Sequence, residues 1–218
     1  MHCLLVAATA AEIAPFTEHL ATTEKLNHID FDVDILITGV GSNAATYHLT
    51  RYLQHKSPDL VIQAGVAGSF EKTAALGSVF AITHDVFADQ GVQEKTGFLD
   101  IFDLKLAAPN VVPYKKSVLP NPNSNLIRRT RLKKAKGITV NEITTQKKKA
   151  DYYINRYNAR IESMEGAPLH FVCLMENISF LQIRSISNYV GERNKKNWNL
   201  PLAIGQLNKE LVRLLESL

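Results

Sequence analysis

The sequence predicts a single-domain α/β protein over residues 1–218, with a mainly parallel central sheet between helices in three α/β/α layers. Three observations carry this prediction. Short apolar runs alternate with helical segments, which is the pattern of right-handed βαβ units. The length is that of one large domain. Hydrophobic residues make up 45% and charged residues 21% of the chain, which is typical of globular proteins and argues against disorder or a coiled coil.

The first half of the chain contains four predicted strands and two predicted helices. Each strand is a short apolar run bounded by turn residues, as expected for strands that are buried on both faces. Ser42 is a favourable N-cap for the second helix. The strands are expected at 3–8, 33–38, 60–64 and 78–86, and the helices at 10–20 and 42–54.

The second half returns to the same alternation after a loop-rich segment. Residues 89–124 contain two glycines and four prolines, so we expect mainly loops there. The strands that follow are predicted at 137–143, 159–164 and 180–187, and the helices at 145–156, 166–176 and 201–217.

The net charge of +4 comes from one segment. Residues 115–149 contain eleven basic residues and one acid, so the rest of the chain has 14 basic residues against 20 acids, a net charge of −6. Nucleic-acid binding by this segment is the less favoured alternative, because it contains no zinc or RNA-binding motif. A solvated basic flank is the favoured interpretation.

The cysteines and histidines indicate the redox compartment of the protein and whether it binds a metal. Cys3 and Cys173 lie 170 positions apart in apolar runs, which indicates buried thiols in a reducing compartment. No apolar run approaches the ~20 residues of a membrane span, and the protein is expected to be cytoplasmic. The histidines show no metal-binding spacing, so neither a metal nor another cofactor is expected.

Two glycine-containing segments follow predicted strands. Residues 39–44 fit the G-x-G-x-x-A pattern of dinucleotide-binding turns, but Asp59 precedes the next strand instead of ending it. A tight turn is therefore favoured over NAD binding. Residues 65–68 are small and are expected to end a strand, where backbone N–H groups can approach a ligand. They lack the Lys-Ser/Thr ending of a P-loop.

Polar residues are predicted to converge at the carboxyl ends of the strands, where ligands bind in open α/β sheets. Glu12, Glu165 and Asn188 each follow a predicted strand. The alternative for both acids is a place in a first helical turn, which the helix dipole favours. Arg184 lies inside an apolar strand and is expected to pair with Glu12 or Glu165, because a buried charge needs a partner.

Taken together, the motifs resemble the nucleoside phosphorylase/hydrolase superfamily and, within it, the futalosine hydrolase branch of the alternative menaquinone pathway. The resemblance spans most of the chain, in the order of the family. The matching runs are Leu4–Glu12, Thr38–Gly41, Ala64–Phe70, Ser163–Gly166 and Arg184–Arg193. It implies a nucleoside phosphorylase-like fold and an N-ribosidic hydrolase that releases hypoxanthine from futalosine.

The resemblance also implies roles for individual residues. Glu12 would activate water, Glu165 would bind the ribose hydroxyls and Met164 would lie against the sugar. The site would be lined by Gly65, Val66, Ala67 and Gly68. Asn188 stands where related methylthioadenosine/adenosylhomocysteine nucleosidases carry an aspartate. A neutral amide can donate hydrogen bonds to a 6-oxopurine, which favours hypoxanthine over adenine as the leaving base.

The related nucleosidases and the purine nucleoside phosphorylases remain alternatives. A phosphorylase must bind a phosphate dianion, and the segments 7–11 and 65–68 offer no Arg or Lys for it. Water is therefore the favoured nucleophile, although Arg184 keeps phosphate chemistry open.

Several further residues are candidates for the rest of the substrate. Ile143 and Thr144, at the end of a predicted strand, are the choice for stacking on the base. Arg193, together with Lys195 and Lys196, is the candidate for the benzoate of futalosine, and Phe98 and Trp198 are possible aromatic walls. Surface cations and core aromatics are the alternatives. The resemblance also implies a homo-oligomer.

Overall fold

The computed structural model describes residues 1–22 and 32–217. In this part of the chain the main sheet has eight strands. The strands are β1 (His2–Ala7), β2 (Asp32–Ile37), β3 (Leu60–Ser69), β4 (Val79–Asp85), β7 (Leu119–Pro120), β8 (Lys133–Thr139), β9 (Ile161–Ser163) and β10 (Phe180–Tyr189). The central ones, such as β1 and β3, are rich in buried apolar residues.

The sheet is mixed, which corrects the prediction of a mainly parallel one. Parallel pairs join β1 to β2 and β3, β3 to β10, and β8 to β4 and β9. Antiparallel pairs join β10 to β4, β3 to β9, and β4 to β7. The short connection between β3 and β4 explains the reversal, because a parallel crossover needs a dozen or more residues. Strands β3, β10, β4, β8 and β9 thereby form a closed ring of pairings.

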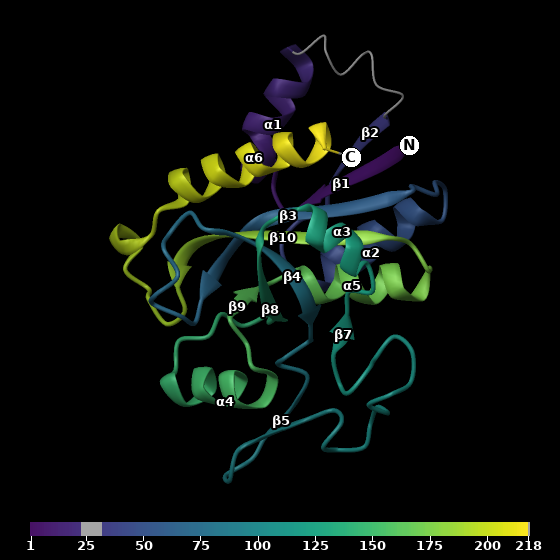
Figure 1. Cartoon of the computed structure of the whole chain (residues 1–218). Coiled ribbons are helices and arrows are strands. Elements are labelled where there is room, and N and C mark those ends of the chain that lie inside the picture. The colour runs from purple at the N-terminus through teal and green to yellow at the C-terminus, as the bar shows by residue number, and fades with distance from the viewer. Residues whose placement is uncertain (23–31, 218) are drawn as a thin grey trace.

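Helices cover both faces of the sheet, so the three predicted layers are present (Figure 1). Helices α1 (Ala10–Thr22) and α6 (Leu200–Glu216) pack on one face, and α2 (Ser42–Leu53) and α5 (Gly166–Met175) pack on the other. The sequence of β1 fixes this arrangement because successive side chains of a strand point to opposite faces. Cys3 and Leu5 join the cluster of α1 and α6, whereas Leu4 and Val6 join that of α2 and α5.

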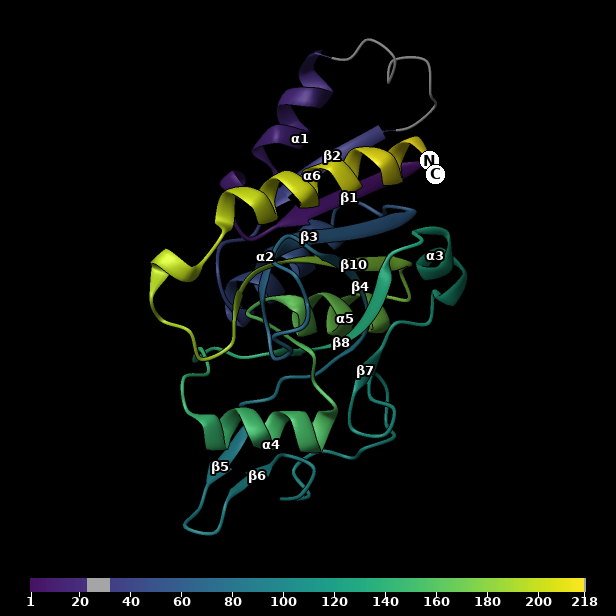
Figure 2. The ribbon, with the colours of Figure 1, turned by 60° about the vertical axis from the view of Figure 1, so that its left-hand side comes forward.

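The segment predicted as loops contains short elements. Strands β5 (Gly91–Gln93) and β6 (Phe98–Asp100) form a separate hairpin, and α3 (Ser124–Arg129) precedes β8. The hairpin and α4 (Lys147–Tyr157) lie on the opposite side of the molecule from α1 and α6 (Figure 2). Asp100 joins them, because its Oδ2 accepts hydrogen bonds from Arg156 Nη2 and Tyr157 Oη, both at 2.9 Å.

Three predicted boundaries were wrong. Strand β3 continues through Ser69, so Gly65–Gly68 is strand and not turn. Strand β8 covers Lys133–Thr139 instead of 137–143. Gly41, and not Ser42, is the N-cap of α2, and its φ of 94° lies in the region that favours glycine.

Candidate active site

One cavity of about 380 Å³ opens where β1, β3, β9 and β10 end. It is lined mainly by small and apolar side chains, with three glutamates among them. The lining residues are Ala8, Thr9, Ala11, Glu12, Val40, Val66, Ala67, Gly68, Ile143, Glu162, Ser163, Met164, Glu165, Ser187, Asn188, Trp198, Leu200 and Ile204. The structure thus brings together Glu12, Glu165 and Asn188 from distant parts of the sequence.

Both carboxylate oxygens of Glu12 are held by hydrogen bonds. The backbone N–H and the hydroxyl of Thr9 donate to Oε2 at 3.0 and 3.1 Å, and the Val66 N–H donates to Oε1 at 3.0 Å. Glu12 lies in the first turn of α1 and is 9% exposed. A carboxylate that is fixed in this way at the wall of a cavity can orient a water molecule and accept its proton.

Glu165 enters the cavity between β9 and α5. Its Oε1 accepts a hydrogen bond from the Gly41 N–H at 2.9 Å, and Gln63 Nε2 donates to its backbone carbonyl at 3.0 Å. Burial raises the pKa of Glu165 above its ordinary value, while the positive charge of Arg184 acts in the opposite direction. One oxygen is anchored by backbone, which leaves the other free to accept hydrogen bonds from a ligand.

The predicted pairing of Arg184 with Glu12 or Glu165 was wrong. Arg184 is 1% exposed, and its Nη2 donates to the neutral Gln63 Oε1 at 2.6 Å. In the described part of the chain it forms no ion pair with an acid. Gly65 leaves room for this guanidinium, since a Cβ there would lie 2.2 Å from Arg184 Nη1 and 2.9 Å from Glu12 Oε1.

Asn188 is half-buried near the end of β10. Its Oδ1 accepts a hydrogen bond from Ser187 Oγ at 2.8 Å, and its Nδ2 donates to the Tyr189 carbonyl at 3.1 Å. The Nδ2 group has a second N–H, which is available for a ligand in the cavity.

The other candidates divide into two groups. Val66, Ala67, Gly68, Ile143 and Met164 line the cavity. Trp198 also lines it, whereas Gly65, Thr144, Phe98, Arg193, Lys195 and Lys196 do not.

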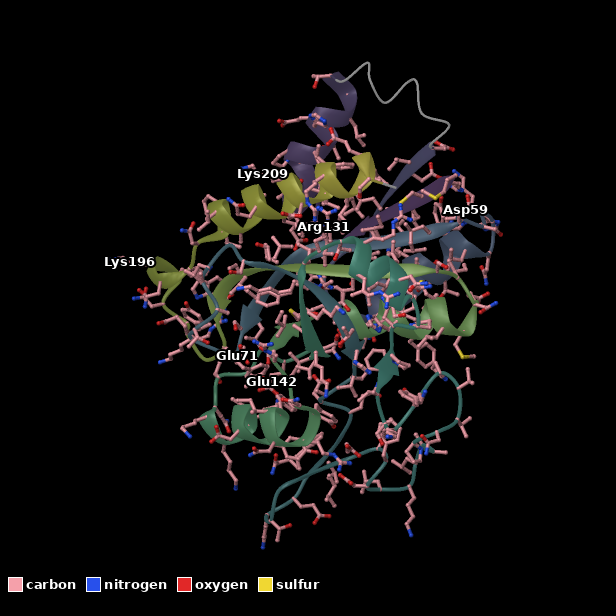
Figure 3. The ribbon with its side chains drawn as sticks, viewed as in Figure 1. Asp59, Glu71, Arg131, Glu142, Lys196 and Lys209 are labelled. Atoms are coloured by element: carbon pink, nitrogen blue, oxygen red, sulfur yellow. The ribbon has the colours of Figure 1, made fainter. Side chains whose placement is uncertain are left out.

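Gly65 lies behind the wall against Arg184, and Thr144 is buried with its N–H donated to Glu162. Phe98 packs against Tyr152 of α4, with ring centroids 5.5 Å apart. Arg193 lies over the ring of Trp198, which does line the cavity, at 5.7 Å. Lys195 and Lys196 are exposed, and Lys196 lies at the outer edge of the molecule (Figure 3).

Three further lining residues were not predicted from the sequence: Glu162, and Leu200 and Ile204 at the start of α6. The signal for Glu162 was its place in a strand directly before Met164 and Glu165. A single acid inside an apolar strand is a reason to look for a buried partner.

No group of three or more His, Cys, Asp or Glu residues suited to a metal ion occurs within residues 1–22 and 32–217. Across the same residues, no helix has the length and apolar character of a transmembrane segment.

Comparison with known families places this mixed α/β fold with its glutamate-lined cavity in a class. The family model described as Phosphorylase superfamily matches residues 4–216. The chain belongs to this superfamily.

Within the superfamily, the chain is similar to curated proteins named futalosine hydrolase. The protein of Streptomyces coelicolor is 26% identical over 228 residues, which cover 98% of this chain and 95% of the relative. That of Acidothermus cellulolyticus is 30% identical over 186 residues, covering 83% and 74%. That of Thermus thermophilus is 28% identical over 181 residues, covering 83% and 80%.

Solved structures share the fold. The Helicobacter pylori 5′-methylthioadenosine/S-adenosylhomocysteine nucleosidase with butyl-thio-DADMe-Immucillin-A has a TM-score of 0.79 at 18% identity, covering 100% of this chain and 99% of that chain. A structure named futalosine hydrolase of the same organism has a TM-score of 0.78 at 17% identity, covering 100% and 98%. At these identities the likeness establishes the fold alone.

Proposed function

We propose that the protein is an N-glycosyl hydrolase that releases hypoxanthine from futalosine. The observation that carries the proposal is the placement of Glu12 and Glu165 in one cavity, together with similarity to three curated futalosine hydrolases. Cleavage of the bond between a purine and ribose passes through an oxocarbenium-like sugar. A site for this reaction must stabilise the cation, supply water on the opposite face and bind the departing base.

The two acids divide the first two tasks. Glu165 accepts hydrogen bonds from the ribose hydroxyls through its free oxygen and places negative charge beside the developing cation. Glu12 orients the attacking water and takes its proton. Its hydrogen bonds to Thr9 and Val66 support this role, because they fix the direction of the carboxylate before the substrate binds. Met164 lies against the sugar.

Asn188 selects the base. Its remaining amide N–H donates to O6 or N7 of a 6-oxopurine, whereas an aspartate would accept from the exocyclic amine of adenine. We therefore expect Asn188→Asp to reduce the preference for hypoxanthine over adenine nucleosides. An unchanged ratio of the two kcat/KM values would contradict this account of base selection.

Water is the nucleophile in this proposal. No Lys or Arg belongs to the cavity lining among the described residues, so a phosphate dianion would meet glutamates without a cation at the wall. Arg184 is held behind the wall by Gln63. The benzoate of futalosine is assigned to Arg193 beside Trp198, and the base to Ile143 with Thr144 behind it. The proposal includes a homo-oligomer, a single domain, no cofactor and a cytoplasmic location.

The test is chromatography of the products from futalosine, inosine and methylthioadenosine, each with and without phosphate. We expect hypoxanthine and the free sugar from futalosine at a rate that does not depend on phosphate. Ribose-1-phosphate-type products would overturn the hydrolase, and faster release of adenine from methylthioadenosine would overturn the substrate. Sedimentation of the purified protein tests the homo-oligomer.

A further inference from the structure

Glu162 is a buried carboxylate that the proposed mechanism does not use. It lies on β9, lines the cavity and is 7% exposed. Its Oε1 accepts a hydrogen bond from the Thr144 N–H at 3.1 Å, and its Oε2 is buried without a hydrogen-bond partner. A buried carboxylate oxygen without a partner is costly, so a site that keeps one usually has a use for it.

The strand register places Glu162 in a row with Asn188. Gly68 on β3 is paired with Glu162 on β9 and with Asn188 on β10. Directly paired residues project from the same face of a sheet, and two strand spacings place the outer Cα atoms about 10 Å apart. Glycine in the middle leaves the face open, since a Cβ at Gly68 would lie 3.4 Å from Asn188 Nδ2.

The two ends of this row have complementary hydrogen-bonding chemistry. The Glu162 carboxylate is an acceptor, and the Asn188 amide has a free N–H donor. A 6-oxopurine presents the matching set along one edge, with a donor at N1–H and acceptors at O6 and N7. A 6-aminopurine presents an acceptor at N1 and a donor at the 6-amino group.

We propose that Glu162 is a specificity-determining residue that accepts the N1–H of a 6-oxopurine base. This inference rests on the proposed function and deepens it. The lone pair of N1 in adenine would face the carboxylate, which repels it. The Thr144 N–H cannot serve as a donor to that lone pair, because it is already bonded to Glu162. Base selection is thereby shared between β9 and β10.

Burial and two neighbouring residues affect the charge of Glu162. Burial raises the pKa of this carboxyl, while the hydrogen bond from the Thr144 N–H and the charge of Lys149 oppose the shift. Lys149 Nζ also bonds Glu142 on the loop before α4, at 3.2 Å. Glu142 is exposed and lies beside α4, so it offers a matched control for a change of charge near the same lysine (Figure 3).

The experiment measures the affinity of free bases by calorimetry. We expect the wild-type protein to bind hypoxanthine about ten- to hundredfold more tightly than 1-methylhypoxanthine, which lacks the N1–H, and more tightly than adenine. Glu162→Gln should reduce the preference for hypoxanthine over adenine by about ten- to hundredfold, because the amide can donate to N1 of adenine. Glu142→Gln should leave the preference unchanged.

Two outcomes would overturn the inference. These are equal wild-type affinities for hypoxanthine and 1-methylhypoxanthine, or an unchanged base preference in folded Glu162→Gln. An unchanged preference with lower affinity for both bases would assign Glu162 to holding the Thr144 loop. The wild-type measurement decides the question even where the variant fails to fold. Turnover of futalosine is measured with the same preparation to separate the two proposals. Absence of turnover would refute futalosine as the substrate but would not refute the contact between Glu162 and the base.

Discussion

Two cavities of opposite charge lie in the same molecule. The proposed active site, of about 380 Å³, is lined by Glu12, Glu162 and Glu165. A second cavity, of about 530 Å³, lies between β4, β8, the 115–118 turn and the end of α4. Its wall carries four cations, Lys115, Lys116, Lys136 and Arg156, with the buried Asp85 among them.

The two cavities differ in how their polar groups are held, and this difference, not volume, distinguishes the proposed site. In the acidic cavity, backbone N–H groups hold Glu12 and Glu165 in place. In the basic cavity, Arg156 is bound to Asp100 and Asp103, and Lys115 and Lys116 are exposed. Negative charge also suits a cationic transition state. The net charge of +4 therefore describes the flank and not the proposed site.

The largest effect should come from Glu12. Glu12→Gln keeps the shape of the side chain but removes the base, so we expect kcat for futalosine to fall by ~10²–10⁴-fold. Steady-state kinetics measures the loss. Glu18→Gln, an exposed change on the same helix, is the control and should leave kcat unchanged. Full activity in Glu12→Gln would break the assignment of function to the acidic cavity.

Asp85 is a buried acid that lies outside the proposed site. It is among the residues that line the basic cavity, yet it is 1% exposed and accepts hydrogen bonds from Thr139 Oγ1 and the Val86 N–H. Burial raises its pKa from the ordinary 3.8 to about 6. The folded state therefore holds the proton more tightly than the unfolded state. The stabilisation is full below pH 3.8 and is lost as the pH rises through about 6.

Asp85→Asn should remove this dependence on pH, since the amide does not ionise. The free energy of unfolding of the variant, relative to the wild-type protein, should rise by about 2–3 kcal/mol between pH 4 and pH 7.5. Urea unfolding at the two pH values measures it. A difference that stays constant with pH would show that Asp85 is not neutral in the folded protein at pH 4, against the burial argument.

Gly65 tests how closely the proposed site is packed. In Gly65→Ala the new methyl group would overlap Arg184 Nη1 and crowd Glu12 Oε1. We expect a loss of about 1–3 kcal/mol in the free energy of unfolding, with reduced kcat. The control is Gly205→Ala on α6, where the added Cβ meets no atom within 4 Å and should stabilise the helix by up to about 1 kcal/mol. Equal effects of the two changes would contradict the packing argument.

Local patterns predicted much of the fold and of the proposed site. Apolar runs placed β1, α1, α2, α5 and α6, because the pattern of neighbouring residues shows which face of a helix or strand is buried. Neighbouring residues do not show which distant strands pair with one another. The sequence could not show that Gly65–Gly68 continues β3, nor that Glu162 is in register with Gly68. Arg184 shows the same limit, since its partner is the neutral Gln63 and not an acid.

The smallest effect on activity is expected from changes in the basic cavity. These changes test whether the basic cavity takes part in the proposed reaction. Lys115→Gln with Lys116→Gln removes two exposed positive charges without changing the backbone turn that carries them. Exposed substitutions of this kind change the free energy of unfolding by about 0.5 kcal/mol or less. We expect kcat/KM for futalosine to stay within about twofold of the wild-type value at low and at high salt. The field of these exposed charges is screened and does not act on a substrate bound at the glutamates. A salt-dependent fall in kcat/KM would mean that the basic cavity attracts the benzoate-bearing substrate, and the two cavities would then share one function.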